Sequence, residues 1–450
     1  MPDEQLMSGA DTIFALSSGR PPAGVAVVRV SGAGARFALE TLAGAVGEPR
    51  RMGLVTLRDP TTKEALDRAL TVYFPGPASA TGEDIAEFHL HGGRAVVADV
   101  LAALGRLDGL RLAEPGEFTR RAFANGVMDL AAVEGLADLI AAETSGQRRQ
   151  ALAQASGALG AAVAGWRERL VGIMALVEAS IDFSDEGDVP TNLVASAQTD
   201  VAALQRDVAA ALDGARRGER MRSGLVVVIA GPPNAGKSSL LNALARREVA
   251  IVSAVPGTTR DAIEVHLDLD GLPVTVIDTA GLREGADPVE KEGIRRARER
   301  MALADLVLWL EPADAPGEAA PEVLAPLWRV ATKCDLAEPP PSDSDSKRDA
   351  VRHRVSARSG AGLDGLVVDL TAAAAELIGG EPPLVTRARQ AQALDAALAA
   401  LGEANRRADS HPELIAEDLR RAAAALGEVI GMVDVEDVLD AIFRQFCVGK

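Results

Sequence analysis

Residues 231–238 have the sequence GPPNAGKS, which matches the pattern Gly-x-x-x-x-Gly-Lys-Ser/Thr. An apolar run at 225–230 precedes the pattern and a helix-forming run at 239–245 follows it, so it joins a predicted strand to a predicted helix. In a loop of this pattern, main-chain N–H groups surround the phosphate oxygens of a bound nucleotide. The lysine neutralises the β and γ phosphates, and the serine can ligate magnesium. A glycine turn without a ligand is the alternative, which the flanking strand and helix disfavour. The expected phosphate-binding residues are Asn234, Ala235, Gly236, Lys237, Ser238 and Ser239.

Two later segments carry residues that a bound nucleotide and its metal would need. They are GTTRD at 257–261 and DTAG at 278–281, where an apolar run ends. We expect Thr259 to ligate magnesium and sense the γ-phosphate, Asp278 to support the metal's ligands, and the Gly281 N–H to contact the γ-phosphate. The same predicted site includes Thr258, Thr279 and Ala280. Each segment alone is a weak signal, but their order is that of a P-loop GTPase.

The base would be selected by residues 332–335, Thr-Lys-Cys-Asp, which follow another apolar run. Asp335 can accept hydrogen bonds from N1 and N2 of guanine, and adenine offers no matching donors. The common motif is Asn-Lys-x-Asp, so Thr332 is a departure that leaves the contact to guanine N7 open. The expected base site also includes Lys333 and a segment that resembles the fifth GTPase loop, Ser356, Ala357 and Arg358.

The residue that orients the attacking water is not where small Ras-like GTPases have it. Leu282 follows the DTAG segment directly, in the place of a glutamine, and it cannot position water. Another group must act. The candidates are the downstream carboxylates Glu284, Asp287, Glu290 and Glu292, each of which could equally be a solvated surface charge.

The surrounding pattern predicts a multidomain α+β and α/β chain. Residues 11–112 alternate short β-branched runs with glycine turns, which favours a small α/β or α+β domain. Residues 118–217 and 385–450 are alanine-rich with the helical period. Between them, 222–377 alternates apolar runs with helical segments, as a doubly wound domain does. We expect domains at 1–117, 118–221, 222–377 and 378–450, with the two helical blocks packed into one discontinuous domain.

Composition and charge exclude several classes of protein. The chain has 450 residues, of which 48% are hydrophobic, 25% charged and 3% aromatic, as in a globular, helix-rich chain. The net charge of −18 disfavours extensive contact with nucleic-acid backbones or acidic membranes. Only two cysteines, Cys334 and Cys447, are present, and no apolar stretch is long enough to span a membrane, so we expect a cytoplasmic protein.

The combined motifs resemble the tRNA modification GTPase family known as MnmE or TrmE. The similarity rests on GPPNAGKSS, PGTTRD, DTAGLRE and the terminal FCVGK, and it covers nearly the whole chain. Segments at 11–13, 28–32, 81–84, 91–93 and 115–118 resemble the N-terminal part of the family. The resemblance implies an N-terminal folate-binding and dimerisation domain, a discontinuous helical domain and an inserted Ras-like P-loop domain.

For the nucleotide site, the resemblance implies Mg2+ and K+ as cofactors of GTP hydrolysis. Magnesium falls on Ser238 and Thr259, and the potassium ligands on Asn234, Ser253, Val255 and Thr258. The water-orienting acid falls on Glu290, and Lys237 is the catalytic lysine. The family is a homodimer whose GTPase domains meet across a gap when GTP is bound.

For the N-terminal domain, the resemblance implies binding of a tetrahydrofolate derivative, 5-formyl or 5,10-methylene. Its ligands fall on Arg29, Glu87 and Lys450, and a further position that is usually basic is Val127 here. Cys447 resembles the family's functional cysteine, and a small packing residue beside Phe446 is the alternative. The implied activity is addition of an aminomethyl or carboxymethylaminomethyl group to C5 of the tRNA wobble uridine, with a flavin-dependent partner similar to MnmG that supplies much of the tRNA contact.

Two alternative functions would require features of their own. A regulatory GTPase switch in ribosome assembly would want a basic RNA-binding domain, and a dynamin-like membrane GTPase would want a basic or amphipathic membrane patch. Neither feature is evident in the sequence. His89 and His91 share one face of a predicted strand, but no third ligand for a metal accompanies them.

Overall fold

The computed structural model describes residues 11–182, 193–251, 264–279, 299–314, 320–336, 353–407, 412–432, 442–444, 446 and 448–449. The chain divides into two compact units. The first comprises Met1–Ala137, Gln154–Val189 and Ser410–Lys450, and the second comprises Asp138–Ala153 and Pro190–Asp409.

The first unit contains a six-stranded sheet in the order β3-β4-β5-β2-β1-β6. Neighbouring strands are antiparallel, except that β1 and β6 are parallel. The strands are β1 (Thr12–Leu16), β2 (Ala23–Ser31), β3 (Gly53–Arg58), β4 (Ala65–Phe74), β5 (Ile85–Gly92) and β6 (Leu110–Leu112). Successive side chains of a strand point to opposite faces of the sheet, and buried apolar side chains gather on one of them. We call this the apolar face, and the opposite face, which carries both polar and apolar side chains, the mixed face.

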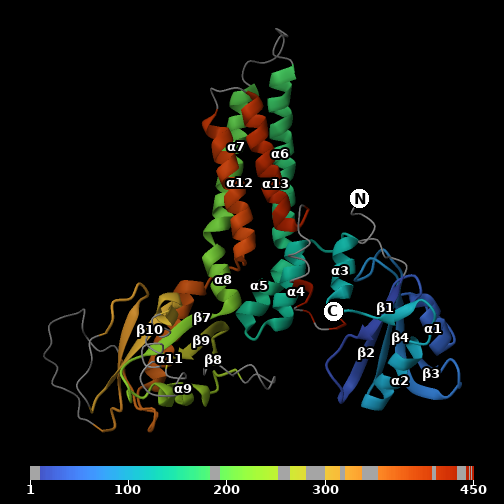
Figure 1. Cartoon of the computed structure of the whole chain (residues 1–450), viewed down its shortest axis with the longest axis horizontal. Helices are drawn as coiled ribbons and strands as arrows, with labels where there is room; N and C mark the ends of the chain where they lie inside the picture. The colour runs from blue at the N-terminus through green and yellow to red at the C-terminus, as the bar shows by residue number, and fades with distance from the viewer. Residues whose placement is uncertain are drawn as a thin grey trace, which may run out of the picture. The chain divides into compact units, whose positions relative to one another are not determined.

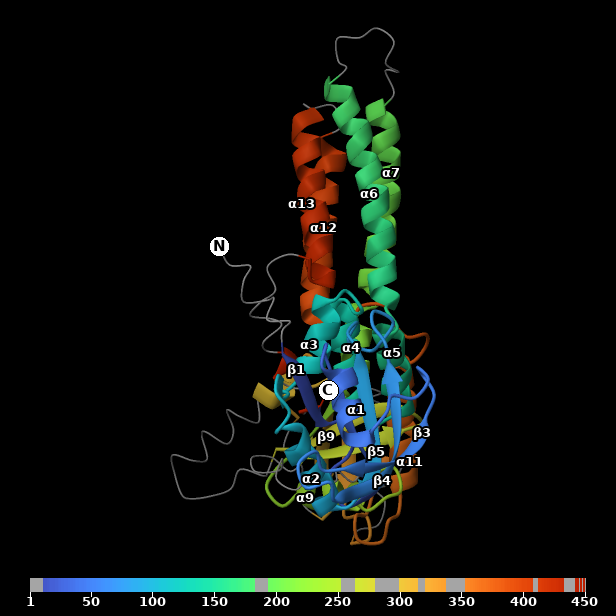
Figure 2. The same ribbon diagram turned by 90° about the vertical axis from the view of Figure 1, so that its right-hand side faces the viewer.

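Two helices, α1 (Ala35–Ala43) and α2 (Arg94–Leu104), cover the apolar face (Figures 1 and 2). The core between them and the sheet includes Phe14, Val28 and Phe88, all at most 1% exposed. On the opposite face, at the β1 side, Phe118 of α3 (Glu117–Ala124) packs with residues of β1. The mixed face therefore carries α3 at one side and exposed strands at the other.

Long helices extend from each unit. In the first unit α6 (Ala158–Asp182) packs against α13 (Pro412–Ile430), and in the second α7 (Leu193–Asp213) packs against α12 (Ala388–Arg406). In α6 the buried residues recur every three or four positions, which gives the helix one apolar stripe. Each pair thus joins a helix that precedes the P-loop segment to one that follows it. Shorter helices are α4 (Leu130–Ala141), α5 (Ser145–Ala155) and α8 (Ala215–Ser223).

The second unit contains a six-stranded sheet in the order β12-β11-β10-β7-β9-β8. All neighbours are parallel except β8 and β9, which form an antiparallel pair. The strands are β7 (Leu225–Ala230), β8 (Glu264–Leu269), β9 (Leu272–Asp278), β10 (Leu306–Pro312), β11 (Leu327–Thr332) and β12 (His353–Arg354). Helices α9 (Lys237–Ala245) and α11 (Leu363–Ile378) pack into the apolar core of this sheet.

The chain enters and leaves this sheet domain at one place. Arg222 Nε, in α8 just before β7, donates to the Thr386 carbonyl at 3.3 Å, although the two residues are 164 positions apart. A Cβ added at Gly218 would lie only 2.1 Å from the Val385 carbonyl oxygen, so the backbones are in close contact. The segments on either side of the P-loop domain are thereby held together.

The predicted mixture of α+β, helical and doubly wound P-loop architecture is confirmed. The strand over 225–230 agrees residue for residue with β7, because it is a continuous apolar run bounded by glycines. The strands β1, β3, β6, β8 and β12 were not predicted. β8 is amphipathic, with His266 and Asp268 among its apolar residues, so its pattern is not that of a buried strand. The domain boundaries stay a prediction.

A close helix contact at Gly135 yields a stability prediction. A Cβ there would lie 2.4 Å from the Ala155 amide nitrogen, whereas a Cβ at Gly172 on α6 meets no atom within 4 Å. Gly135→Ala should lower the free energy of unfolding by about 1–3 kcal/mol through overpacking. Gly172→Ala is the matched control and should be neutral or stabilising by up to about 1 kcal/mol. Thermal unfolding followed by circular dichroism would test both, and a Gly135→Ala midpoint at or above wild type would contradict the contact.

Candidate functional site

The phosphate loop lies where the order of strands reverses. β7 is central, β9 and β8 lie on one side of it, and β10, β11 and β12 on the other, which leaves a crevice at the carboxyl ends. At that end Gly231 has a φ of +147°, and a Cβ on it would lie 2.6 Å from the Leu310 carbonyl oxygen, so only glycine fits. Lys237 begins α9, and its Nζ donates to the carbonyl oxygens of Gly231 and Pro232 at 2.9 and 2.8 Å.

Two oxygen-bearing side chains suited to a magnesium site meet beside this loop. Ser238 Oγ donates to Asp278 Oδ2 at 2.6 Å, and Asp278 ends β9 with none of its surface exposed. Thr279 Oγ1, next along the chain, donates to the Ile229 carbonyl at 3.0 Å and so fixes the end of β9 to β7. A hydroxyl and a carboxylate form the hard oxygen donor set that Mg2+ prefers, so the residues present fit this ion. In this arrangement Ser238 would ligate the ion and Asp278 would orient that ligand.

A pocket of about 180 Å³ opens beside the loop. Its lining brings together seven residues of the predicted nucleotide site, namely Gly236, Ser239, Thr332, Lys333, Asp335, Ala357 and Arg358. It also contains Leu240, Leu336 and Val355, which sequence reasoning missed. No motif marks them in the sequence: Leu240 belongs to the helix-forming run, and Leu336 and Val355 lie outside the apolar runs.

Partners hold the polar side chains of this pocket in place. Ser356 Oγ donates to Asp335 Oδ1 at 2.7 Å, and this hydrogen bond lowers the pKa of Asp335 below its usual value. The carboxylate stays ionised and keeps acceptor positions for the donors of a guanine edge. Lys333 has a φ of +57°, and its Nζ pairs with Asp314 at 3.0 Å. Asp314 was not predicted, because no motif marks it.

Several predicted residues lie outside the described part of the chain. They are Ser253, Val255, Thr258, Thr259, Ala280, Gly281, Glu284, Asp287, Glu290, Glu292, Cys447 and Lys450. Asn234, the remaining predicted potassium ligand, is described and has a φ of +63° in the phosphate loop.

In the first unit, the predicted folate residues Arg29 and Glu87 form a cross-strand pair on the mixed face of the sheet. Arg29 donates from Nε and Nη2 to Glu87 Oε1 at 2.9 and 2.8 Å. His89 Nε2 lies 3.2 Å from Glu87 Oε2, and the Arg29 guanidinium lies 5.8 Å from the Phe118 ring centroid. Val127 is 43% exposed. An arginine that can grip a carboxylate thus lies beside an acid that can accept from a pterin edge.

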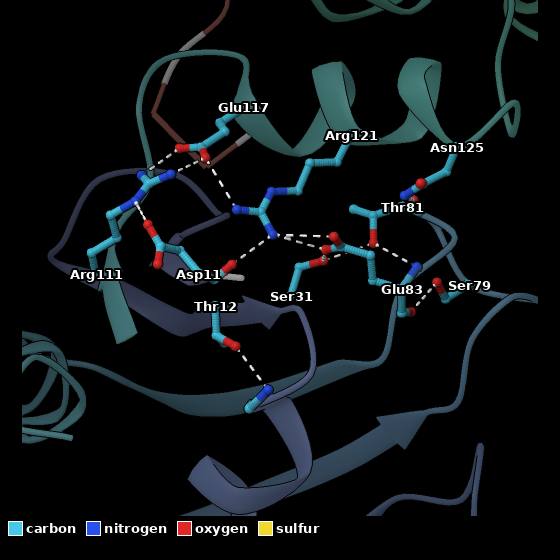
Figure 3. Close-up of polar contacts among 11 residues, drawn as sticks. Asp11, Thr12, Ser31, Ser79, Thr81, Glu83, Arg111, Glu117, Arg121 and Asn125 are labelled. Carbon is cyan, nitrogen blue, oxygen red and sulfur yellow. Dashed lines mark hydrogen bonds and ion pairs between the residues drawn. The ribbon is translucent and has the colours of Figure 1, made fainter. Parts of the chain in front are cut away.

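A network of charged groups fixes α3 on this face (Figure 3). Arg121 of α3 donates to both carboxylate oxygens of Glu83 at 3.2 and 3.0 Å, and to Glu117 at 3.3 Å. Glu83 also accepts from Ser31 at 2.8 Å, at the end of β2. Because Ser31 and Arg29 lie two residues apart on the same strand face, the network holds α3 against the strand that carries Arg29.

The Glu117 carboxylate is the second centre of the network. Arg111 donates to its two oxygens at 2.9 and 2.6 Å, and the Glu114 amide donates at 2.8 Å. Burial raises the pKa of Glu117, but the hydrogen bonds from Arg111 and the Glu114 amide outweigh burial, so the pKa lies below its usual value. The segment at 115–118, predicted from resemblance, therefore anchors α3 to β6.

The mostly parallel sheet, the glycine-bounded phosphate loop, the Ser238–Asp278 pair and the base pocket define a domain of the P-loop GTPase class. Among the described residues, no group of three His, Cys, Asp or Glu side chains could hold a metal ion, and His91 instead pairs with Asp67 at 2.7 Å. In the same part of the chain, no helix is both long and apolar enough to cross a membrane.

Comparison with known proteins gives the family. Residues 12–127 match the model described as GTP-binding protein TrmE N-terminus, and residues 130–447 match the MnmE helical domain. Proteins named tRNA modification GTPase MnmE are 58% identical in Azorhizobium caulinodans and 57% in Methylobacterium sp. (strain 4-46). These alignments cover 98% of this chain and 99% and 100% of the two relatives. The chain belongs to the MnmE family of tRNA modification GTPases, which confirms the resemblance.

The Glu117 contacts yield a pH prediction. Because the folded-state pKa lies below the ordinary 4.5, the carboxylate stabilises the fold above about pH 4.5, and this stabilisation is lost as pH falls through the folded-state pKa. Glu117→Gln should lower the free energy of unfolding by about 1–3 kcal/mol at pH 7, and the difference from wild type should shrink below pH 4.5. Glu114→Gln, at an exposed neighbouring acid, is the control. Urea unfolding at several pH values would test this, and a pH-independent difference would contradict it.

Proposed function

We propose that this chain hydrolyses GTP to drive modification of tRNA wobble uridines. In the reaction, an aminomethyl or carboxymethylaminomethyl group is added to C5 of the uridine of certain tRNAs, with a folate as one-carbon donor. The observation that carries the proposal is the presence, in one chain of the MnmE family, of a GTPase site and of the Arg29–Glu87 pair.

In the hydrolytic site, the proposed role of Lys237 is to neutralise the β and γ phosphates, and that of Asp335 is to select guanine. Mg2+, when bound, would stabilise charge on the phosphates, and Ser238 and Thr259 are the residues that would hold it. K+ would be held by Asn234, Ser253, Val255 and Thr258. Since Leu282 cannot orient water, the proposed water-orienting acid is Glu290.

In the N-terminal sheet, the proposed folate site consists of Arg29, Glu87 and Lys450. The paired guanidinium and carboxylate support it, and the charge network of α3 holds the strand that carries Arg29. Val127 supplies no charge, so the folate glutamyl carboxylate depends more on Arg29. The proposed role of Cys447 is in one-carbon transfer. Loss of 5-formyltetrahydrofolate binding in Arg29→Ala, measured by calorimetry, would support the site, and unchanged affinity would count against it.

The proposed assembly is a cytoplasmic homodimer that works with a flavin-dependent, MnmG-like partner. Val25, Leu54 and Leu70, on the mixed face of the N-terminal sheet, are 58%, 56% and 40% exposed, an unusual set of apolar side chains for a monomer surface. The net charge of −18 supports a protein whose partner makes most of the tRNA contact. Sedimentation of the full chain would show whether it is a dimer or a monomer.

The pathway is tested by mass spectrometry of tRNA nucleosides from a strain that lacks the gene. We expect the C5 side chain of the wobble uridine to disappear and to return when the wild-type gene is restored. A variant with Lys237→Ala should fail to restore it, because the phosphate contact is lost. An unchanged nucleoside profile would contradict the proposal and favour the regulatory GTPase in ribosome assembly.

The catalytic acid is tested by Glu290→Ala. We expect GTP binding to be preserved and hydrolysis to fall by about 100-fold, which is the usual contribution of a general base. Glu292→Ala is the matched control and should retain hydrolysis. Phosphate release would be measured in potassium and in sodium buffers, with faster turnover expected in potassium. Near-normal turnover of Glu290→Ala would remove Glu290 from this role, and equal rates in the two salts would count against the potassium ligands.

A further inference from the structure

The departure at Thr332 from the common Asn-Lys-x-Asp motif has a defined place in the structure. Thr332 ends β11 and lines the base pocket, and it is only 4% exposed. Its Oγ1 donates to the Ala235 carbonyl in the phosphate loop at 2.6 Å, while the Glu311 carbonyl is 3.5 Å away. The side chain therefore connects the loop that selects the base to the loop that holds the phosphates.

This contact uses the only proton that the side chain has. A threonine hydroxyl carries one donor, so when it points at the Ala235 carbonyl it presents only lone pairs to other groups. Guanine N7 is an acceptor, and two acceptors do not form a hydrogen bond. An asparagine amide has two N–H donors and could serve both the Ala235 carbonyl and N7.

We propose that Thr332 is a positioning residue that ties the phosphate loop to the base loop, and that this GTPase binds guanine without a hydrogen bond to N7 from this side chain. Recognition then rests on the Watson–Crick edge, through Asp335 held by Ser356 at 2.7 Å. N7 is an acceptor in both adenine and guanine, whereas the N1 and N2 donors belong to guanine alone. The missing hydrogen bond to N7 thus lowers the affinity for either purine and leaves the selectivity for guanine over adenine unchanged. This inference depends on the GTPase domain and not on the tRNA reaction.

The first test needs no variant. Binding of GDP and of 7-deaza-GDP to the full wild-type chain would be compared by calorimetry. We expect the two dissociation constants to agree within about twofold, because the contact that 7-deaza-GDP lacks is worth about threefold to tenfold where it exists. Inosine diphosphate, which lacks the N2 amino group, is the control and should bind about tenfold to a hundredfold more weakly, because it loses a hydrogen bond to the ionised Asp335 carboxylate. A wild-type preference for GDP over 7-deaza-GDP of about threefold or more would overturn the inference.

Variants at the same position separate the two roles of the residue. Thr332→Asn should create a preference for GDP over 7-deaza-GDP of about threefold to tenfold, because the amide adds a donor for N7. Thr332→Val, which keeps the shape but removes the donor, should weaken both ligands by the same factor of about threefold to tenfold. Thr332→Ser, which keeps the hydroxyl donor, should bind GDP and 7-deaza-GDP with wild-type affinity. Wild-type affinity in Thr332→Val, or a loss confined to GDP, would contradict the role of Thr332 as a connection between the loops.

Discussion

The nucleotide site depends on one topological constraint, the reversal of strand order at β7. Parallel strands present their carboxyl ends to the same edge, and here β7 has β9 and β8 on one side and β10, β11 and β12 on the other. Consequently Gly231 after β7, Asp278 at the end of β9 and Thr332 at the end of β11 arrive at one crevice. The hydrogen bonds Ser238–Asp278 and Thr332–Ala235 then connect the ends of β9 and β11 to the phosphate loop and the start of α9.

In the N-terminal sheet, hydrogen bonds and ion pairs hold charged side chains in place on a partly exposed face. Glu83 and Glu117 are each bound by arginine, and Ser31 joins Glu83 to β2. Asp84, next to Glu83, accepts from Tyr73 Oη at 2.6 Å, and burial together with this bond raises the pKa of Tyr73 to about 12. The polar segment at 81–84 is thus a structural connection between strands and α3. It supports the strand that carries Arg29 without itself being part of the Arg29–Glu87 pair.

The sequence predicts the site correctly where neighbouring residues form a distinctive motif. Gly231 and Lys237 lie in a pattern whose spacing already implies a loop between a strand and a helix, and the structure has that arrangement. It failed where the partner is distant. Asp314 pairs with Lys333, and nothing near either residue in the sequence indicates the other. Arg29 and Glu87 are 58 positions apart on ordinary strands, so only the family resemblance selected them. The Thr332 hydroxyl bond to Ala235 likewise depends on a neighbour 97 positions away.

The joined entry and exit of the P-loop domain have a consequence for the order of folding. Helices α7 and α12 pack together, yet the chain between them includes the 164-position separation of Arg222 and Thr386. Closing a flexible loop of that length costs about 4–5 kcal/mol of entropy. A folded P-loop domain removes most of that cost, because its two ends already lie side by side. We therefore expect α7 and α12 to pack together late, after the inserted P-loop domain has folded. A substitution that destabilises the P-loop domain would then also slow the pairing of these two helices.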